Sequence, residues 1–208
     1  MPSDEELVRA WQTGSRSAAD TLTQRYYWRV FRFFELKLQW QAEDLTQRTF
    51  LLCLEQQDRI RSSFRSYLFG IARRQLTRAL RDRYADAHRR RKLGEPSPGD
   101  HQTRLSALAA QRQEQQVLLR AMAELSPDAQ MTLALYYWEA MNAAQLAEVF
   151  EVSHSAMRSR LAKARADLRA SIDALLTSSA VQKALHADLD GWARSVAATN
   201  LPPPAGSA

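Results

Sequence analysis

The sequence predicts an all-α protein made of two small helical domains that a flexible linker joins. Glycine and proline, which disfavour helix interiors, account for only 6 and 7 of the 208 residues. Apolar residues recur at intervals of three and four positions in most segments, which is the period of a helix with one buried face. We find no sustained alternation of apolar and polar residues, so no strand is expected.

Three helices are predicted in the first domain, residues 1–92. Residues 20–40 carry a wide apolar stripe at helical spacing, and residues 43–56 carry a second amphipathic pattern. A third pattern begins near Phe64 and continues into an arginine-rich stretch. Together these segments predict one compact helical domain.

A linker at residues 93–112 separates this domain from the second domain, residues 113–176. Its sequence, LGEPSPGDHQTRLSALAAQR, opens with Pro, Gly, Ser and Asp, which favour turns and loops over helix. A connection of this length lets the two flanking domains move independently.

Start signals place further helices in the second domain. Ser126 with the Pro that follows it suits an N-cap and a first helical position, so a helix is predicted over 127–138. Asn142 is a second N-cap, for a short helix that ends at Phe150. A basic helix follows from Ser153.

The C-terminal extension, residues 177–208, is predicted to be partly disordered. Residues 181–192 hold one weak amphipathic pattern, which leaves open whether it packs on the second domain or on a partner. The last residues, NLPPPAGSA, are expected to be disordered.

Positive charge is concentrated in two segments of a chain whose net charge is +6. Residues 57–92 contain twelve Lys and Arg against three acids, and residues 153–170 contain five against one. The rest of the chain carries a net charge of −7. One basic segment alone is most simply a solvated helix face. Two of them, on separate domains of an otherwise acidic chain, indicate a polyanion and favour nucleic acid.

Several classes of function are not expected. The single cysteine, Cys53, lies among leucines, which favours a buried packing thiol over a redox sensor, and no Cys/His cluster indicates a metal site. The sequence has no paired carboxylates, Gly-rich phosphate loop or nucleophile arrangement, so we expect neither an enzyme nor a cofactor. The polar N-terminus and the lack of a long apolar stretch predict a cytoplasmic protein without a membrane segment.

The basic helix at residues 153–169 has a face suited to DNA. At about 100 degrees per residue, its apolar residues form one narrow core stripe. Small residues lie opposite and long bases flank them, so the helix can enter a groove while its edges reach phosphates and bases. With the short helix before it, this segment predicts a helix-turn-helix. The alternative is an ordinary helical hairpin with a solvated basic face.

Motifs in both domains resemble the extracytoplasmic-function (ECF) sigma factors of RNA polymerase. In the second domain, QLAEVFEVS and AMRSRLAKARADLR are similar to EIAevLgvs and TVkSRLxRAr..LR of the family's region 4. In the first domain, AEDLTQRTFLL and SFRSYLFGIARRQLTRALRDR are similar to AEDLvQetFl and sFraWLyxIARN...D..RRR of region 2. The resemblance covers residues 5–92 and 113–176 in the family's order. Two matches in that order across a linker are hard to obtain by chance.

The resemblance implies a protein that binds core RNA polymerase, through the β′ coiled-coil and the β flap, and directs it to promoter DNA. Region 2 would capture the melted minus-10 element, and the region 4 helix would read the minus-35 element in the major groove. Polymerase would supply the catalysis. The residues carried over are Glu43, Asp44, Gln47 and Arg48 for core polymerase; Phe64, Tyr67, Arg73, Arg74, Arg78, Arg81 and Arg83 for the minus-10 element; and Ser155, Arg158, Ser159, Arg160 and Lys163 for the minus-35 element. For Phe64 and Tyr67, core packing is favoured over contact with bases.

Three arginines depart from the family pattern. Arg48 stands where Glu or Asp is usual, on the helix implied to contact a basic polymerase surface, so it is expected to weaken that contact. Arg74 and Arg78 replace the usual Asn and Asp, which predicts an unusual minus-10 preference.

Two threonines, Thr46 and Thr49, flank Arg48 and suggest a switch. A phosphate on either would add a charge of about −2 beside the arginine. Phosphorylation by a Ser/Thr kinase is therefore one hypothesis for how the polymerase contact is strengthened. The alternative is that both are ordinary helix residues.

Two other functions stay open. A sigma mimic that occupies an anti-sigma factor without starting transcription would tolerate Arg48, but it would not need the basic helix. An ordinary helix-turn-helix repressor leaves the arginine-rich residues 57–92 unexplained. The expected partners are core RNA polymerase and promoter DNA, with an anti-sigma factor or a Ser/Thr kinase as candidate regulators and no membrane.

Overall fold

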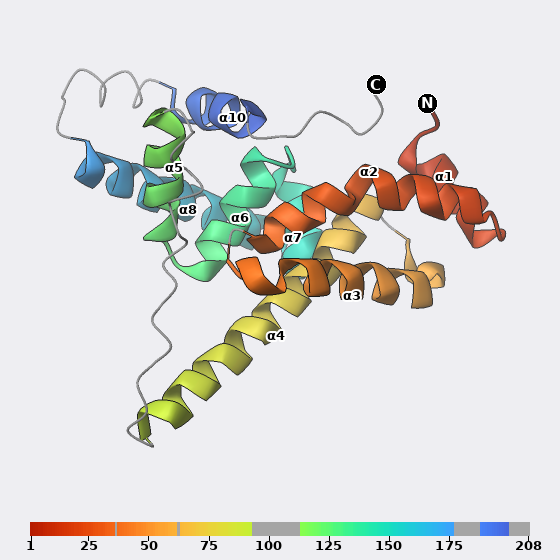
Figure 1. Ribbon diagram of the computed structural model, residues 1–208. Coiled ribbons are helices and arrows are strands. Elements are labelled where there is room, and N and C mark those ends of the chain that lie inside the picture. The colour runs from red at the N-terminus through yellow and green to blue at the C-terminus, as the bar shows by residue number, and fades with distance from the viewer. Residues whose placement is uncertain (36, 62, 93–112, 177–187, 200–208) are drawn as a thin grey trace. The chain divides into compact units, whose positions relative to one another are not determined.

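In the part of the chain that the computed structural model describes, every regular element is a helix (Figure 1). That part comprises residues 1–35, 37–61, 63–92, 113–176 and 188–199. The all-α prediction is confirmed. The chain divides into two compact units, Met1–Arg104 and Leu105–Ala208. The predicted linker and the terminal NLPPPAGSA lie outside the described residues.

The first unit is a helical bundle in which successive helices pack on one another. Helix α1 packs on α2, α2 on α3, and α3 on α4. Large side chains that are fully buried at its centre include Leu22, Phe34, Leu68 and Phe69. The helices are α1 (Asp4–Gln12), α2 (Arg16–Glu35), α3 (Ala42–Glu55) and α4 (Phe64–Lys92), with short 3-10 helices η1 (Gln39–Gln41) and η2 (Gln57–Arg59) around α3.

Helix α1 has no counterpart among the predicted elements. Ser3 begins it with a capping box: its hydroxyl accepts from the Glu6 N–H at 3.2 Å, and the Glu6 carboxylate accepts from the Ser3 N–H at 2.7 Å. The Asp4 carboxylate then accepts hydrogen bonds from the Tyr26 hydroxyl and the Arg25 guanidinium, which joins α1 to α2. Burial, reinforced by that carboxylate, raises the pKa of Tyr26 well above its usual range.

The other helices of the first unit follow the predicted patterns with one shift. Helix α2 both begins and ends earlier than the predicted 20–40, and Leu38, still 0% exposed, is buried from a loop after the helix. Helix α4 is continuous from the core into the arginine-rich stretch (Figure 1). Most of its described side chains from Arg81 onward are exposed.

The second unit is built around one long helix. This helix is α8 (His154–Leu175), and α5 (Gln113–Ala123), α6 (Pro127–Tyr137) and α7 (Ala143–Phe150) each pack on it. The predicted caps are confirmed. The Ser126 hydroxyl accepts from the Ala129 N–H at 3.3 Å, and the Asn142 side chain accepts from the Gln145 N–H at 3.0 Å.

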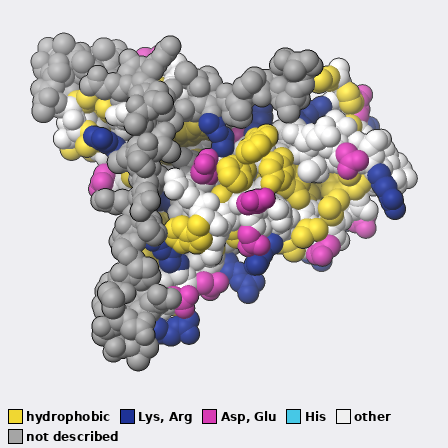
Figure 2. Space-filling model, in the orientation of Figure 1, with side chains coloured by type: hydrophobic (Ala, Val, Ile, Leu, Met, Phe, Trp, Pro, Cys, Tyr) yellow, Lys and Arg dark blue, Asp and Glu magenta, His cyan; other side chains and the backbone are white. Residues whose placement is uncertain are grey.

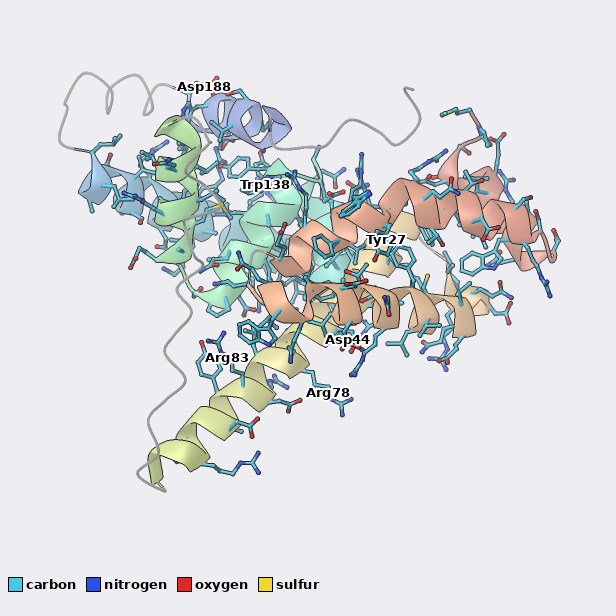
Figure 3. The ribbon with its side chains drawn as sticks, viewed as in Figure 1. Tyr27, Asp44, Arg78, Arg83, Trp138 and Asp188 are labelled. Carbon is cyan, nitrogen blue, oxygen red and sulfur yellow. The ribbon has the colours of Figure 1, made fainter. Side chains whose placement is uncertain are left out.

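The C-terminal extension adds helix α10 (Leu189–Thr199), which packs on α5 and α6. The helix lies further along the chain than the predicted 181–192, most of which falls outside the described residues. Asp188 stands at its start (Figure 3), where its carboxylate accepts from the Gly191 N–H at 2.8 Å. Ala193 and Val196 are buried. The described part of the extension, helix α10, therefore packs on the second unit.

Candidate nucleic-acid interface

Helices α7 and α8 form the predicted helix-turn-helix. The chain reverses at Glu151, whose φ of 55° and ψ of 45° lie in the left-handed region. The next N–H, of Val152, donates back to the Ala147 carbonyl at 3.1 Å, which closes the end of α7. The Ser153 hydroxyl accepts from the Ala156 N–H at 3.2 Å and so begins α8.

Helix α8 buries one face and exposes the other, as the sequence predicts. Its buried side chains are Met157, Leu161, Ala164, Leu168 and Ile172. The side chains proposed for the minus-35 element are all exposed: Ser155, Arg158, Ser159, Arg160 and Lys163. The fold thus places them together on the side of the motif that is open to a ligand.

The basic side chains of α8 differ in their partners. Lys163 lies 3.1 Å from the Asp167 carboxylate in an exposed pair, which contributes little energy. Arg165 is paired with Asp190 of α10. Within the described residues, the exposed Arg158, Arg160 and Arg169 have no ion-pair partner. Their charges are the most available to an anion.

The four core-polymerase candidates share the exposed face of α3. Glu43, Asp44, Gln47 and Arg48 are all exposed. The Arg48 Nε lies 3.0 Å from the Asp44 carboxylate, with both side chains more than half exposed. Arg48 therefore neutralises part of the negative charge on this face, since its guanidinium pairs with Asp44.

Exposed hydrophobic side chains extend this face, and sequence reasoning missed them. Leu51 and Leu54 are 57% and 45% exposed on α3, and Trp28 is 52% exposed on α2. Figure 2 shows hydrophobic side chains gathered over α2 and α3. The helical spacing from Gln47 to Leu51 and Leu54 was the signal that could have placed both leucines on the exposed side.

The structure contradicts the phosphorylation hypothesis. Thr46 and Thr49 are both 0% exposed. Their hydroxyls donate to the carbonyls of Ala42 and Leu45 at 2.6 Å and 2.7 Å. A kinase cannot reach either hydroxyl in the folded domain, and a phosphate would have to enter the core. The two threonines are ordinary buried helix residues.

Phe64, at the start of α4, packs in the core, as the interpretation favoured for it predicts, and is not available to DNA in this fold. It is 3% exposed and makes edge-to-face contacts with Trp11 and Tyr26, with ring centroids 6.4 Å and 5.3 Å away. Tyr67 is half-buried, and its hydroxyl donates to the Gln56 carbonyl at 3.1 Å. Burial raises the pKa of Tyr67.

The arginines of α4 lie along its length, and most are open to solvent. Arg74, Arg78 and Arg81 are exposed, whereas Arg73 and Arg83 are half-buried. Figure 3 shows Arg78 and Arg83 projecting from α4. They leave a basic surface on the part of the helix that the sequence analysis assigns to the minus-10 element.

An aromatic residue joins this basic surface from outside the helix. The Arg83 guanidinium lies over the ring of Trp40 at 4.9 Å from its centroid, and Trp40 is 56% exposed. An exposed aromatic ring beside arginines is the arrangement on which unstacked bases can stack. Sequence reasoning missed Trp40 because only the fold brings it beside Arg83.

No metal-binding group of His, Cys, Asp or Glu occurs among the described residues. Of the helices described, none combines the length and the apolar character that a membrane span needs. Cys53 is 1% exposed, in agreement with a packing role.

Family profiles match the chain in both units. The profile described as Sigma-70 region 2 matches residues 19–85, and the profile described as Sigma-70, region 4 matches residues 115–168. A "Probable RNA polymerase sigma factor RfaY" of Xanthomonas campestris pv. campestris is 30% identical over 142 residues. These are 62% of this chain and 33% of the relative, so the chain spans about a third of that relative's length.

One solved structure is similar to most of the chain. It is described as the structure of CnrH in complex with the cytosolic domain of CnrY, with a TM-score of 0.58 and 21% sequence identity. The similarity covers 82% of this chain and 97% of that one. At this identity the likeness shows a shared fold. Helix α10 lies outside both profile matches.

Proposed function

The chain belongs to the sigma-70 family of RNA polymerase sigma factors, and on this basis we propose that it is an ECF-type sigma factor that binds core polymerase and directs it to specific promoters. The observation that carries this proposal is the exposed basic face of α8. There, Arg158 and Arg160 stand on a helix-turn-helix without ion-pair partners among the described residues. Guanidinium groups so placed can donate two hydrogen bonds to a guanine or hold a phosphate.

The exposed face of α3 is the proposed contact with core polymerase. It combines the charged residues Glu43 and Asp44 with the exposed Leu51 and Leu54. Apolar side chains that lose their water on binding contribute most of the energy of an interface, while charges at its rim set partner choice and association rate. Arg48 lowers the net negative charge of this face and so weakens its attraction to a basic partner.

The surface of α4 with Trp40 is the proposed site for the melted minus-10 strand. Arg74, Arg78 and Arg81 supply positive charge for the backbone, and Trp40 supplies a ring for an unpaired base. In this proposal the chain contributes binding energy and the polymerase contributes the chemistry.

Regulation by a second protein is consistent with the proposed role as an ECF-type sigma factor. CnrH was solved in complex with the cytosolic domain of CnrY, and by analogy of fold we propose that this chain binds a regulatory protein, an anti-sigma factor. The burial of Thr46 and Thr49 removes the support for control by a kinase at those positions.

Core binding is tested with the full-length chain and purified core polymerase. We expect a complex that Leu51→Glu weakens at least about tenfold, because a charge at a desolvated apolar contact costs more than 1 kcal/mol. Leu175→Glu is the matched control, since Leu175 is an exposed leucine, 42% exposed, in the second unit. It should bind like the unaltered chain. Failure of the unaltered chain to bind core polymerase would overturn the proposed function.

A further inference from the structure

We propose that helix α10 is part of the DNA-binding surface and that its Arg194 holds a backbone phosphate of the promoter duplex. The inference rests on the proposed DNA-binding role of α8 and extends it to an element outside the matched family regions.

A cavity of about 490 Å³ lies between α8, the end of α6, the start of α7 and Arg194 of α10. Three arginines line it: Arg158 and Arg165 from α8, and Arg194 from α10. Ala143, at the start of α7, and Ala162, on the exposed face of α8, also line it. The cavity is therefore continuous with the face proposed to enter the major groove.

Arg194 is oriented but keeps its charge available. Its guanidinium lies over the ring of Tyr136, 5.0 Å from the centroid, and its side chain is exposed. Such a contact fixes a guanidinium by its face and leaves its N–H donors free at the edge. Within the described part of the chain, no carboxylate forms an ion pair with Arg194.

Asp190 joins α10 to α8 and α6 through polar contacts. Its carboxylate pairs in bidentate fashion with Arg165, at 3.0 Å to Nε and 2.6 Å to Nη2. It also accepts from the Tyr137 hydroxyl at 2.9 Å. Burial and this hydrogen bond raise the pKa of Tyr137 well above its usual range. Among the described residues that line the cavity, Arg165 forms an ion pair with Asp190, and three arginines against this one carboxylate leave the cavity with a net positive charge.

The occupant that fits this cavity is a phosphodiester of DNA. When the second helix of a helix-turn-helix lies in the major groove, the first crosses the sugar–phosphate backbone. The start of α7 and the cavity beside it then face that backbone. A phosphodiester brings one negative charge and acceptor oxygens, which match the two exposed arginines, Arg158 and Arg194, that line the cavity.

The test uses the full-length chain and a mixed-sequence DNA duplex, because binding of such a probe reports phosphate contacts without requiring the promoter sequence. Arg194→Gln should weaken binding and lower the slope of log affinity against log salt by about 1. The ratio of the unaltered chain's affinity for the duplex to that of Arg194→Gln should then fall about threefold between about 50 and 200 mM salt. Arg120→Gln, an equal loss of charge at an exposed site on α5, should change neither quantity.

The outcomes separate the inference from the proposed function. If Arg158→Gln weakens binding while Arg194→Gln leaves affinity and salt slope unchanged, α10 does not contact DNA and the inference is wrong. If Arg158→Gln is also without effect, α8 is not the DNA-binding surface, and both proposals fail.

Inorganic phosphate distinguishes the two sources of a phosphate group. At constant ionic strength, we expect it to compete with the duplex no better than chloride does. Thermal stabilisation of the unaltered chain by millimolar phosphate, absent in Arg194→Gln, would assign the cavity to a small phosphate ligand and overturn the proposal for DNA.

Discussion

Glu151 holds the turn of the helix-turn-helix in a conformation that favours glycine. Its φ of 55° brings Cβ close to the backbone, at a cost of about 1 kcal/mol relative to glycine. The region 4 pattern similar to QLAEVFEVS has a glycine at this position. The neighbouring hydrogen bonds that close α7 impose the conformation despite the side chain.

Replacing Glu151 therefore offers a stability prediction at a single residue. Glu151→Gly should be more stable than Glu151→Ala by about 1 kcal/mol, because both remove the charge and only glycine relieves the strain. Hydrogen exchange of the α7 and α8 amides measures the difference. Equal protection in the two variants would show that Glu151 stores no strain.

Cys53 gives a second prediction at this scale. Burial raises the pKa of its thiol to about 12, from a reference value of 9.0. The folded protein should therefore react slowly with a disulfide reagent at pH 8 and fully once it is unfolded, because the thiolate is the reactive form. Rapid reaction of the folded chain would contradict the burial.

The same shift fixes the sign of a pH effect on stability. Between pH 9.0 and about 12 the unfolded chain releases the Cys53 proton and the folded chain keeps it. The free energy of unfolding therefore falls as pH rises through this window. Below the window, the contribution of the protonated Cys53 thiol to stability is fully present. Tyr26 and Tyr137, whose pKa values are also raised, act in the same direction.

Single residues show where a sequence pattern fails. Phe64 and the neighbouring Tyr67 look alike as aromatics beside a basic stretch, yet Phe64 packs against Trp11 and Tyr26 in the core. Thr46 and Thr49 are polar and flank an exposed arginine, yet helix geometry turns both inward. Core packing was already favoured for Phe64, and its burial agrees; for the two threonines, which flank an exposed residue, only the burial decides.

At the scale of elements, α3 separates its roles by face. Thr46 and Phe50 lie on the buried side, whereas Asp44, Arg48 and Leu51 lie on the exposed side. Because Arg48 pairs with Asp44, its replacement by an acid also frees that carboxylate.

Arg48→Glu should tighten binding to core polymerase by about 1 kcal/mol, roughly fivefold, if the partner surface is basic. Arg16→Glu, the same change at an exposed position of α2, is the control and should have little effect. The measurement is a titration of core polymerase with each variant at low salt. Weaker binding of Arg48→Glu would mean that the arginine itself contacts an acid on the partner.

The Asp190 carboxylate joins helix α10 to α8 and α6 through Arg165 and Tyr137. Asp190→Asn should lower the hydrogen-exchange protection of α10 by about 1–3 kcal/mol, because it removes the charge that Arg165 and Tyr137 bind. Glu148→Gln, at an exposed site of α7, should leave α10 unchanged. Unaltered protection in Asp190→Asn would show that apolar packing alone holds the helix.

Elements with a local start signal could be predicted well. Ser126 and Asn142 are caps in the structure as in the sequence, and the continuation of α4 follows its pattern. Helix α1 was not predicted, although Ser3 and Glu6 form a capping box. It is short and its first turn is acidic, so its three buried residues, Leu7, Val8 and Trp11, give only a weak periodic pattern. The pair of Trp40 and Arg83 was beyond prediction, since its members are far apart in the chain.

In the whole molecule, the distribution of charge agrees with the motifs of the two units. The chain has two basic segments, and its remaining residues carry a net charge of −7. Most of one basic segment lies on α4 and the other lies on α8. Each unit matches a different sigma-70 region. The order of the units was predictable from sequence because each carries its own motif. The packing of α10 was not, because no motif describes it.

We propose that both units act together to make core polymerase specific for particular promoters. The direct test mixes core polymerase with the full-length chain and a genomic DNA template, and maps the 5′ ends of the transcripts. We predict new start sites that share two upstream elements, and their loss in Arg158→Gln while core binding is retained. Binding to core polymerase without any new start site would contradict the account and identify the chain as a sigma mimic instead.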